Sequence, residues 1–295
     1  MQAFEYFQPK TVREAVQALH KHPKAMVLAG GTDLLVRMKD RVNRPPAVVD
    51  VKRLPRSDDL SYAGKTGLHI GAAVSMRQVE LSSVAQSRFG AIAQGATFVG
   101  SIQIRNRATV IGNVCNAAPS ADTAPGLIVH DAKVQIAGPK GRRTMTVEDF
   151  MKGPGKNDLK RGEFVLGIQV PAPKPRTGSA YVRHTPREAM DIAVVGVGAS
   201  VTLSPKGICT AAGICLGAVA PVPLRATKAE SILVGQKLTP GKIAQAALVA
   251  SDEARPITDV RATAGFRREM VRVLTERMIK AASRAATPTR SRRAA

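Results

Sequence analysis

The sequence predicts an α+β protein of two domains, of which the second is the smaller. Three observations support this class. A strand, a glycine turn, a helix and a second strand follow one another within the first fifty residues, a proline-rich connector lies at residues 171–178, and paired strands followed by helices come after it. A chain of 295 residues with 44% hydrophobic residues can bury a core large enough for this arrangement.

The first fifty residues predict a βαβ-like unit. A helix, a strand, a glycine turn, a helix start and a second strand are expected, in that order, at residues 11–20, 25–28, 29–33, 34–38 and 47–51. Apolar side chains recur at helical spacing in the first helix, and Thr11 with Glu14 predicts a capping box at its start. We expect this unit to form a subdomain at residues 1–56.

A second subdomain is expected at residues 57–171. Strands are predicted at residues 68–71, 127–134 and 165–170, a hairpin turn at residues 138–141, and helices from Ser75 and at residues 90–99. Residues 100–122 are dominated by glycine and polar residues and are too long for a simple loop. We therefore expect this stretch to be a binding segment, with an extended backbone at residues 105–122. Taken by itself, that segment fits an irregular surface loop as well.

The connector at residues 171–178 contains three prolines and two basic residues, which is typical of a domain boundary. The first domain is therefore expected at residues 1–171 and the second at residues 177–285. In the second, two paired strands and three helices are predicted at residues 193–203, 207–220, 227–234, 242–254 and 262–285. Residues 286–295 are expected to be a disordered basic tail.

Composition argues against several classes of protein. The three cysteines, Cys115, Cys209 and Cys215, include no C-x-x-C pair, so we expect neither a disulfide framework nor an iron–sulfur or zinc site on this chain. No apolar run is long enough for a transmembrane helix, and the N-terminus lacks the pattern of a secretory signal, so a cytoplasmic location is expected.

The net charge of +22 invites a nucleic-acid-binding interpretation. The basic residues are spread along the whole chain, however, and aromatic residues make up only 3%, so platforms for base stacking are scarce. A basic face that docks on acidic partner subunits, or a general basic bias, ranks above nucleic-acid binding.

The glycine turn at residues 29–33 is the first segment that suggests chemistry. Consecutive backbone N–H groups between a strand and a helix can point at an anion, and glycine lets the backbone approach phosphate oxygens closely. An ordinary tight turn explains the segment equally well by itself. It matches neither G-x-G-x-x-G nor G-x-x-x-x-G-K-[ST], so a Rossmann or Walker-type site gains no support.

A resemblance to a known family joins this turn to later segments. The chain has AGGTD at residues 29–33, ATVIGN at residues 108–113, NAAPSAD at residues 116–122 and RHTPREAMDIAVVGV at residues 183–197. In this order and at these separations they resemble the FAD-binding medium subunit of the carbon monoxide dehydrogenase and xanthine dehydrogenase family, over about residues 1–282. The resemblance implies a two-part FAD-binding domain of the vanillyl-alcohol oxidase (PCMH) type, followed by a smaller α+β domain with an antiparallel sheet and helices.

The resemblance also implies a set of cofactor-binding residues. These are Leu28, Ala29, Gly30, Gly31, Thr32, Asp33, Leu34, Thr109, Ile111, Gly112, Asn113, Asn116, Ala117, Ser120, Asp122 and Asp191. Residues 29–33 would hold the FAD pyrophosphate through backbone N–H groups. Thr109, Gly112 and Asn113 would line the other face of the cofactor.

Four further residues receive roles with alternatives. Asp122 would hydrogen-bond ribityl or ribose hydroxyls, Asp191 would act near the flavin or only cap a strand, and Phe98 would pack on the adenine or in the core. Ile111 departs from the family, which usually has glycine there, so its side chain must face away from the cofactor or alter the fit.

The function implied by the resemblance is electron transfer within a molybdenum hydroxylase. Electrons would pass from a large molybdopterin-binding subunit through two [2Fe–2S] clusters of a small subunit to FAD on this chain, and then to an external acceptor. The assembly would be a dimer of heterotrimers, and this chain would need neither a catalytic acid or base nor a metal of its own. The rivals are a stand-alone FAD oxidoreductase of the same fold, a nucleic-acid-binding protein and a flavin-free scaffold subunit.

Overall fold

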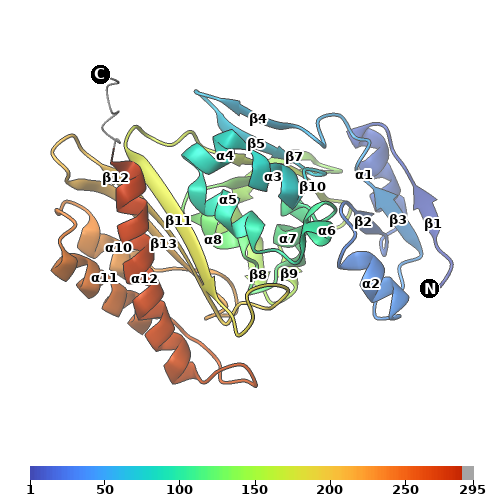
Figure 1. Cartoon of the computed structure of the whole chain (residues 1–295). Coiled ribbons are helices and arrows are strands. Elements are labelled where there is room, and N and C mark those ends of the chain that lie inside the picture. The colour runs from blue at the N-terminus through green and yellow to red at the C-terminus, as the bar shows by residue number, and fades with distance from the viewer. Residues whose placement is uncertain (288–295) are drawn as a thin grey trace.

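The N-terminal part of the chain is a small parallel sheet with two helices, seen at the right of Figure 1. The computed structural model describes residues 1–287. The strands pair in the order β1-β3-β2, and the elements are β1 (Glu5–Phe7), α1 (Val12–Lys21), β2 (Met26–Leu28), α2 (Leu34–Lys39) and β3 (Ala47–Asp50). The predicted helix–strand–turn–helix–strand order is therefore confirmed, and β1 adds a strand that was not predicted.

The capping box predicted at α1 is only half present. The Thr11 hydroxyl accepts a hydrogen bond from the Glu14 backbone N–H at 3.1 Å, as predicted. The Glu14 carboxylate, however, accepts from the backbone N–H of Lys10 at 2.8 Å. The prediction was wrong in that half, because the carboxylate reaches one residue beyond the cap.

A five-stranded antiparallel sheet forms the middle of the molecule. Its strands follow the order β4-β5-β10-β6-β7 and lie at Leu60–Ala63, Gly67–Gly71, Phe164–Val170, Lys133–Gly138 and Gly141–Thr146. The helices are α3 (Met76–Leu81), α4 (Ser83–Arg88), α5 (Gly90–Thr97), α6 (Ile102–Arg105), α7 (Val110–Asn116), α8 (Thr123–Ile128) and α9 (Val147–Phe150), and β8 (Met151–Gly153) pairs with β9 (Lys156–Asn157). The predicted hairpin turn is confirmed, because Gly138 pairs with Gly141.

Two predictions for this region were wrong. Residues 100–122 are not extended, because they contain the helices α6 and α7, each capped by a hydroxyl side chain, Ser101 and Thr109. Residues 127–134 are not one strand, since α8 runs to Ile128 and β6 begins only at Lys133. All six residues of α8 are buried, so its sequence carries no helical alternation of polar and apolar residues that could have revealed it.

The C-terminal region, residues 177–287, is an antiparallel sheet covered by helices. The strands follow the order β11-β12-β13-β14 and lie at Thr177–His184, Val195–Leu203, Cys209–Gly217 and Leu224–Arg225. The helices are α10 (Thr227–Leu233), α11 (Pro240–Glu253) and α12 (Ala264–Ala286). The predicted strand pair and helices are confirmed, β11 was not predicted as a strand, and the predicted tail beyond Thr287 lies outside the described residues.

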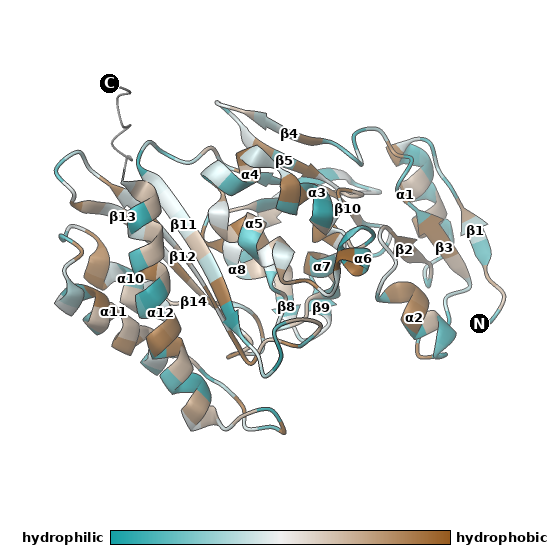
Figure 2. Ribbon diagram, in the orientation of Figure 1, coloured by the Kyte–Doolittle hydropathy of each residue, from teal (hydrophilic) through white to brown (hydrophobic). Residues whose placement is uncertain are grey.

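The C-terminal sheet is buried on both faces. Helices α10 and α12 pack on one face, with α11 packed against these two helices, while α5 and α8 of the middle region pack on the other face. Eight of the nine residues of β12 are buried as a result. Figure 2 shows that α12, which packs on only one side, carries both hydrophilic and hydrophobic residues along its length. A polar contact joins the C-terminal sheet to the middle region, because the Ser200 hydroxyl on β12 donates to the carbonyl of Val129 at 2.8 Å.

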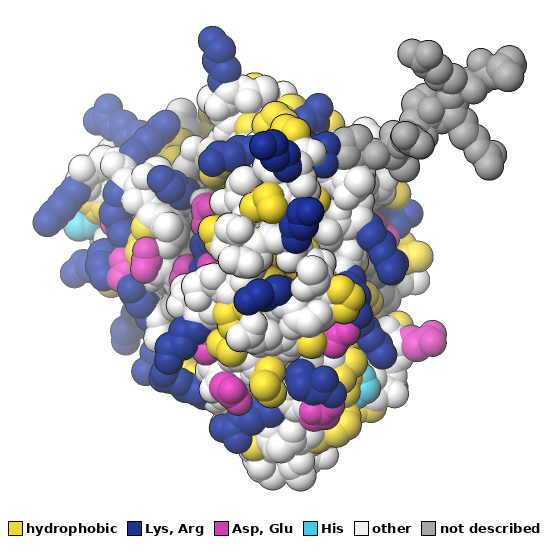
Figure 3. Space-filling view, turned by 90° about the vertical axis from the view of Figure 1, so that its left-hand side faces the viewer, with side chains coloured by type: hydrophobic (Ala, Val, Ile, Leu, Met, Phe, Trp, Pro, Cys, Tyr) yellow, Lys and Arg dark blue, Asp and Glu magenta, His cyan; other side chains and the backbone are white. Residues whose placement is uncertain are grey.

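The surface over the C-terminal helices carries many basic side chains. Figure 3 shows Lys and Arg spread over this face with acidic and hydrophobic side chains between them. On the face shown, these basic side chains form no continuous stripe. This agrees with basic residues that are distributed along the whole sequence. Among residues 1–287, no helix has the length and hydropathy needed to cross a membrane.

Candidate functional site

A cavity of about 590 Å³ lies where the N-terminal unit, the middle region and the C-terminal region meet. The turn after β2 forms one wall and α7 the facing wall. The hairpin β8–β9 and the loop between β11 and β12 also contribute lining residues. Its volume is within the range of pockets that take organic cofactors.

Glycine is required at two positions of the turn. A Cβ on Gly30 would lie 2.2 Å from the carbonyl oxygen of Arg107, so only glycine lets the turn pack against the segment leading into α7. Gly31 has a φ of +76°, a conformation that side-chain-bearing residues rarely adopt. Gly30 therefore lets the turn contact the segment before α7 along one edge of the cavity, and Gly31 lets the backbone adopt the turn.

The turn presents a row of unused backbone donors. Within residues 1–287, the N–H groups of Gly30, Gly31, Thr32, Asp33 and Leu34 donate to no protein acceptor. Leu34 begins α2, so these donors lie at the end of the helix where its dipole favours negative charge. Successive N–H groups of this kind form the usual protein cradle for a phosphate group.

The facing wall is the first turn of α7. Thr109 caps the helix by accepting from the Gly112 N–H at 3.0 Å. Val110, Ile111 and Val114 are buried and turn toward the core. Ile111 is only 4% exposed and packs in that core cluster, although it also borders the cavity.

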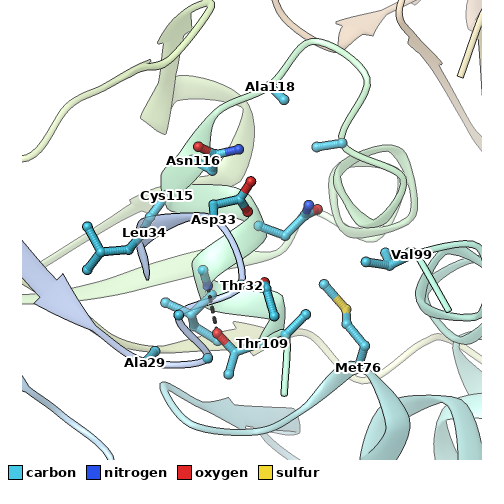
Figure 4. A pocket seen from close by; sticks show the side chains of 18 of the residues that line it. Ala29, Thr32, Asp33, Leu34, Met76, Val99, Thr109, Cys115, Asn116 and Ala118 are labelled. Atoms are coloured by element: carbon cyan, nitrogen blue, oxygen red, sulfur yellow. Dashed lines mark hydrogen bonds between the residues drawn. The ribbon is translucent and has the colours of Figure 1, made fainter. Parts of the chain in front are cut away.

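Polar side chains around the cavity are free to bind a ligand. Thr32, Asn116 and Ser120 line it and make no side-chain hydrogen bond to any group in residues 1–287. Figure 4 shows Thr32 and Asp33 on the turn, and Thr109 and Asn116 on α7, around one space. An elongated ligand with phosphate at one end and hydroxyl groups along its length fits this set of donors and acceptors.

The third side of the cavity is closed by a buried ion pair. Asp122 accepts from the Tyr181 hydroxyl at 2.7 Å and from the Arg183 guanidinium at 2.6 Å, and both of these partners lie on β11. The Asp122 and Arg183 side chains are 8% and 3% exposed. Burial raises the pKa of Asp122, and the Arg183 charge and the Tyr181 hydrogen bond oppose that rise.

Phe98 lies behind this ion pair. The Arg183 guanidinium stands 5.2 Å from the centre of the Phe98 ring, and the Tyr181 ring meets Phe98 edge-on at 5.9 Å. Phe98 is not among the residues that line the cavity. Its packing therefore agrees with the core alternative, and it supports the charged wall from behind.

The structure brings most of the predicted residues together. Those that line the cavity are Ala29, Gly30, Gly31, Thr32, Asp33, Leu34, Thr109, Ile111, Gly112, Asn113, Asn116, Ser120, Asp122 and Asp191. Leu28 and Ala117 do not, because both are buried in core clusters. The Asp191 carboxylate accepts from the backbone N–H groups of Arg187 and Ile192, so it also orders its own loop.

Several lining residues were missed by sequence reasoning. Arg37 and Asn43 come from α2 and the loop after it, Asn157 from β9, and Arg183 from β11. The helical position of Arg37, one turn past the glycines, could have suggested it. Asn43 and Asn157 are placed by loop paths and strand pairing that the motifs do not encode. Arg183 is the first residue of the segment at residues 183–197 that carries the resemblance, but no role was predicted for it.

Comparisons with known proteins agree with this geometry. Residues 2–173 match the family described as the FAD binding domain in molybdopterin dehydrogenase. Residues 180–282 match the CO dehydrogenase flavoprotein C-terminal domain. The two matches together span nearly the whole chain.

Similar proteins point the same way. The chain is 32% identical to the xanthine dehydrogenase FAD-binding subunit of Escherichia coli, over 95% of this chain and 96% of the relative. A solved carbon monoxide dehydrogenase structure from Hydrogenophaga pseudoflava has a TM-score of 0.91 at 32% identity, covering 97% of this chain and 99% of its own. Quinoline 2-oxidoreductase from Pseudomonas putida has a TM-score of 0.88 at 28% identity, covering 97% and 99%. The chain therefore belongs to the FAD-binding medium subunits of the carbon monoxide dehydrogenase and xanthine dehydrogenase family of molybdenum hydroxylases, and it is an oxidoreductase flavoprotein subunit.

Proposed function

We propose that this chain is the electron-transfer subunit of a heteromeric molybdenum hydroxylase, holding FAD between the [2Fe–2S] clusters of a small partner subunit and an external acceptor. The observation that carries the binding mode is the row of unused N–H donors at residues 30–34, which faces α7 across the cavity. FAD supplies chemistry that accepts electrons singly and releases them as a pair.

The residues of the chain bind and orient that cofactor. The N–H groups of residues 30–34 hold the pyrophosphate, and the dipole of α2 favours its negative charge. Thr109, Gly112 and Asn113 line the opposite side, and Thr32, Asn116 and Ser120 hydrogen-bond its hydroxyl groups. Both oxygens of Asp122 already have protein partners, so its predicted bond to a ribityl or ribose hydroxyl uses a remaining lone pair.

The partners are proposed from the names of the relatives. Carbon monoxide dehydrogenase medium chains are among them, and a medium chain implies other chains. We propose a small subunit with [2Fe–2S] clusters, a large subunit with the molybdenum cofactor, and a dimer of heterotrimers in the cytoplasm. The substrate site then lies on the large subunit, and this chain acts as neither general acid nor general base.

The direct test is the visible absorption spectrum of the purified chain, followed by heat release and identification of any cofactor. We expect the bands of oxidised flavin and the release of FAD rather than FMN. A colourless chain that also fails to take up added FAD would contradict the proposal. If the chain holds FAD, electron transfer is then tested by following the flavin bands after the reduced iron–sulfur subunit is added.

A further inference from the structure

A second crevice lies away from the cofactor cavity, between the end of α4 and the connector that leads into β11. It has a volume of about 460 Å³ and shares no lining residue with the first cavity. The residues that line it are Ser87, Arg88, Pro173, Lys174, Pro175, Arg176 and Thr177. They include three cations and two hydroxyl groups, and no carboxylate.

The three cations of this crevice are not neutralised within the chain. Among residues 1–287, neither Arg88, Lys174 nor Arg176 forms an ion pair with an Asp or Glu. The Arg88 guanidinium lies 5.0 Å from the centre of the Tyr62 ring, which holds it at the crevice without using its N–H donors. Like charges placed together without counter-charges repel one another, so this arrangement favours an anion from outside the chain.

Arg176 adds two independent signs of a binding position. Its Nε is buried and has no hydrogen-bond partner in residues 1–287, although a buried donor normally has one. Its φ of +60° is in the left-handed region, which costs free energy for a residue other than glycine. Glycine or asparagine would adopt this backbone conformation at position 176 more easily. The arginine there therefore lowers the stability of the folded chain, which a function of its guanidinium would explain.

We propose that this crevice is a binding site for a phosphate group, distinct from the FAD cavity. Arginine side chains bind phosphate through paired N–H donors, so the three cations carry the binding. The hydroxyls of Ser87 and Thr177 border the same crevice, but they already hydrogen-bond to the carbonyl of Ser83 and the hydroxyl of Thr202. Because its cations come both from α4 and from the connector, the bound phosphate holds the connector against the middle region.

The test is calorimetric titration of the purified protein, saturated with FAD so that the glycine turn of the first cavity is occupied. The titrants are inorganic phosphate and, separately, glycerol phosphate, at constant ionic strength. The variants are Arg88→Gln and Arg176→Gly. Glycine suits the left-handed backbone at position 176, so Arg176→Gly should fold at least as well as the parent without phosphate. Arg41→Gly is the matched control, since Arg41 has a φ of +59° and lines neither cavity.

We expect one saturable phosphate site in the parent and in Arg41→Gly, and binding about 10- to 100-fold weaker in Arg176→Gly and Arg88→Gln. The melting temperature of the parent should rise with phosphate, and that of Arg176→Gly should not. Tighter binding of glycerol phosphate than of inorganic phosphate identifies a phosphate ester as the occupant, and equal binding identifies free phosphate. Absence of saturable binding, equal binding by Arg176→Gly and the parent, or equal competition by acetate would each overturn the proposal.

Discussion

Two sides of the cofactor cavity are built in opposite ways. On the side of the glycine turn, the donors at residues 30–34 have no partner in the described part of the chain, and the packing depends on the absence of a side chain at Gly30. On the side of β11, Asp122, Tyr181 and Arg183 are buried and bonded to one another. The first side keeps its polar groups free for a ligand, whereas the second uses its polar groups to hold two regions of the chain together.

This difference predicts that the two sides fail differently. A change at the turn should act mainly on FAD, because the turn's donors have nothing else to bind. A change at the ion pair should act mainly on the fold, because a buried charge that loses its partner keeps its desolvation cost. Stability and FAD affinity, measured together, therefore separate the two sides.

The largest expected effect is that of Arg183→Met. This change leaves the Asp122 carboxylate buried without its cationic partner, and we expect the free energy of unfolding to fall by about 3–5 kcal/mol. Urea unfolding of the flavin-free chain measures it. The double variant Arg183→Met with Asp122→Leu removes both charges and should recover most of that loss, because well-packed apolar pairs can replace buried ion pairs. If Arg183→Met alone were as stable as the parent, the ion pair between Asp122 and Arg183 would not be what holds β11 against the middle region.

The next effect comes from a histidine behind the same strand. His130 is buried, its Nε2 lies 2.8 Å from the Ser179 hydroxyl on β11, and its ring packs against Phe89. Burial lowers the pKa of His130 to about 4, against the smaller opposing effect of Asp131. The unfolded chain therefore binds a proton at this residue at higher pH than the folded chain does. Stability should fall as pH drops from about 6.5 to about 4, by about 3 kcal/mol in all from this residue.

The measurement is urea unfolding at several pH values in that window for the parent, His130→Gln and His20→Gln. His130→Gln should show a shallower loss of stability with falling pH, whatever its stability at neutral pH. His20 is exposed on α1, so His20→Gln should keep the slope of the parent. Equal slopes for all three proteins would mean that His130 is protonated as readily in the folded chain as in the unfolded one.

Much of the fold follows from local pattern. Apolar spacing and a hydroxyl cap predict α1, and two segments joined by a proline and glycine turn at residues 204–207 predict the strand pair β12 and β13. The failures occur where burial on all sides removes the pattern, as in α8, or where small residues conceal a short capped helix, as in α7. Tertiary packing, rather than the residues' own preferences, decides those elements.

The candidate site divides in the same way. The turn at residues 29–33 and the segment around Thr109 can be read from motifs, because backbone geometry requires glycine and a cap at fixed places. The bonds from Tyr181 and Arg183 to Asp122 join residues about sixty positions apart. Nothing in the local sequence predicts that pairing, since it depends on β11 packing against α5.

Gly30→Ala is expected to have the smallest effect on the stability of the fold and the most specific effect on FAD affinity. The added Cβ meets the Arg107 carbonyl, so the turn must shift away from α7 and its N–H groups lose their alignment. Loss of one charge-assisted hydrogen bond weakens FAD binding about 10- to 100-fold. Gly64→Ala is the matched control, because a Cβ there meets nothing within 4 Å.

Flavin fluorescence titration of the stripped proteins measures the affinity, and thermal unfolding of the same samples measures the fold. We expect Gly64→Ala to match the parent in both, and Gly30→Ala to bind FAD more weakly while still unfolding cooperatively. If Gly30→Ala instead kept full affinity, the free N–H groups of the turn would not be what holds the pyrophosphate. The contrast between a ligand-binding side and a structural side of the cavity would then have to be abandoned, because the β11 side offers few unbonded donors to replace them.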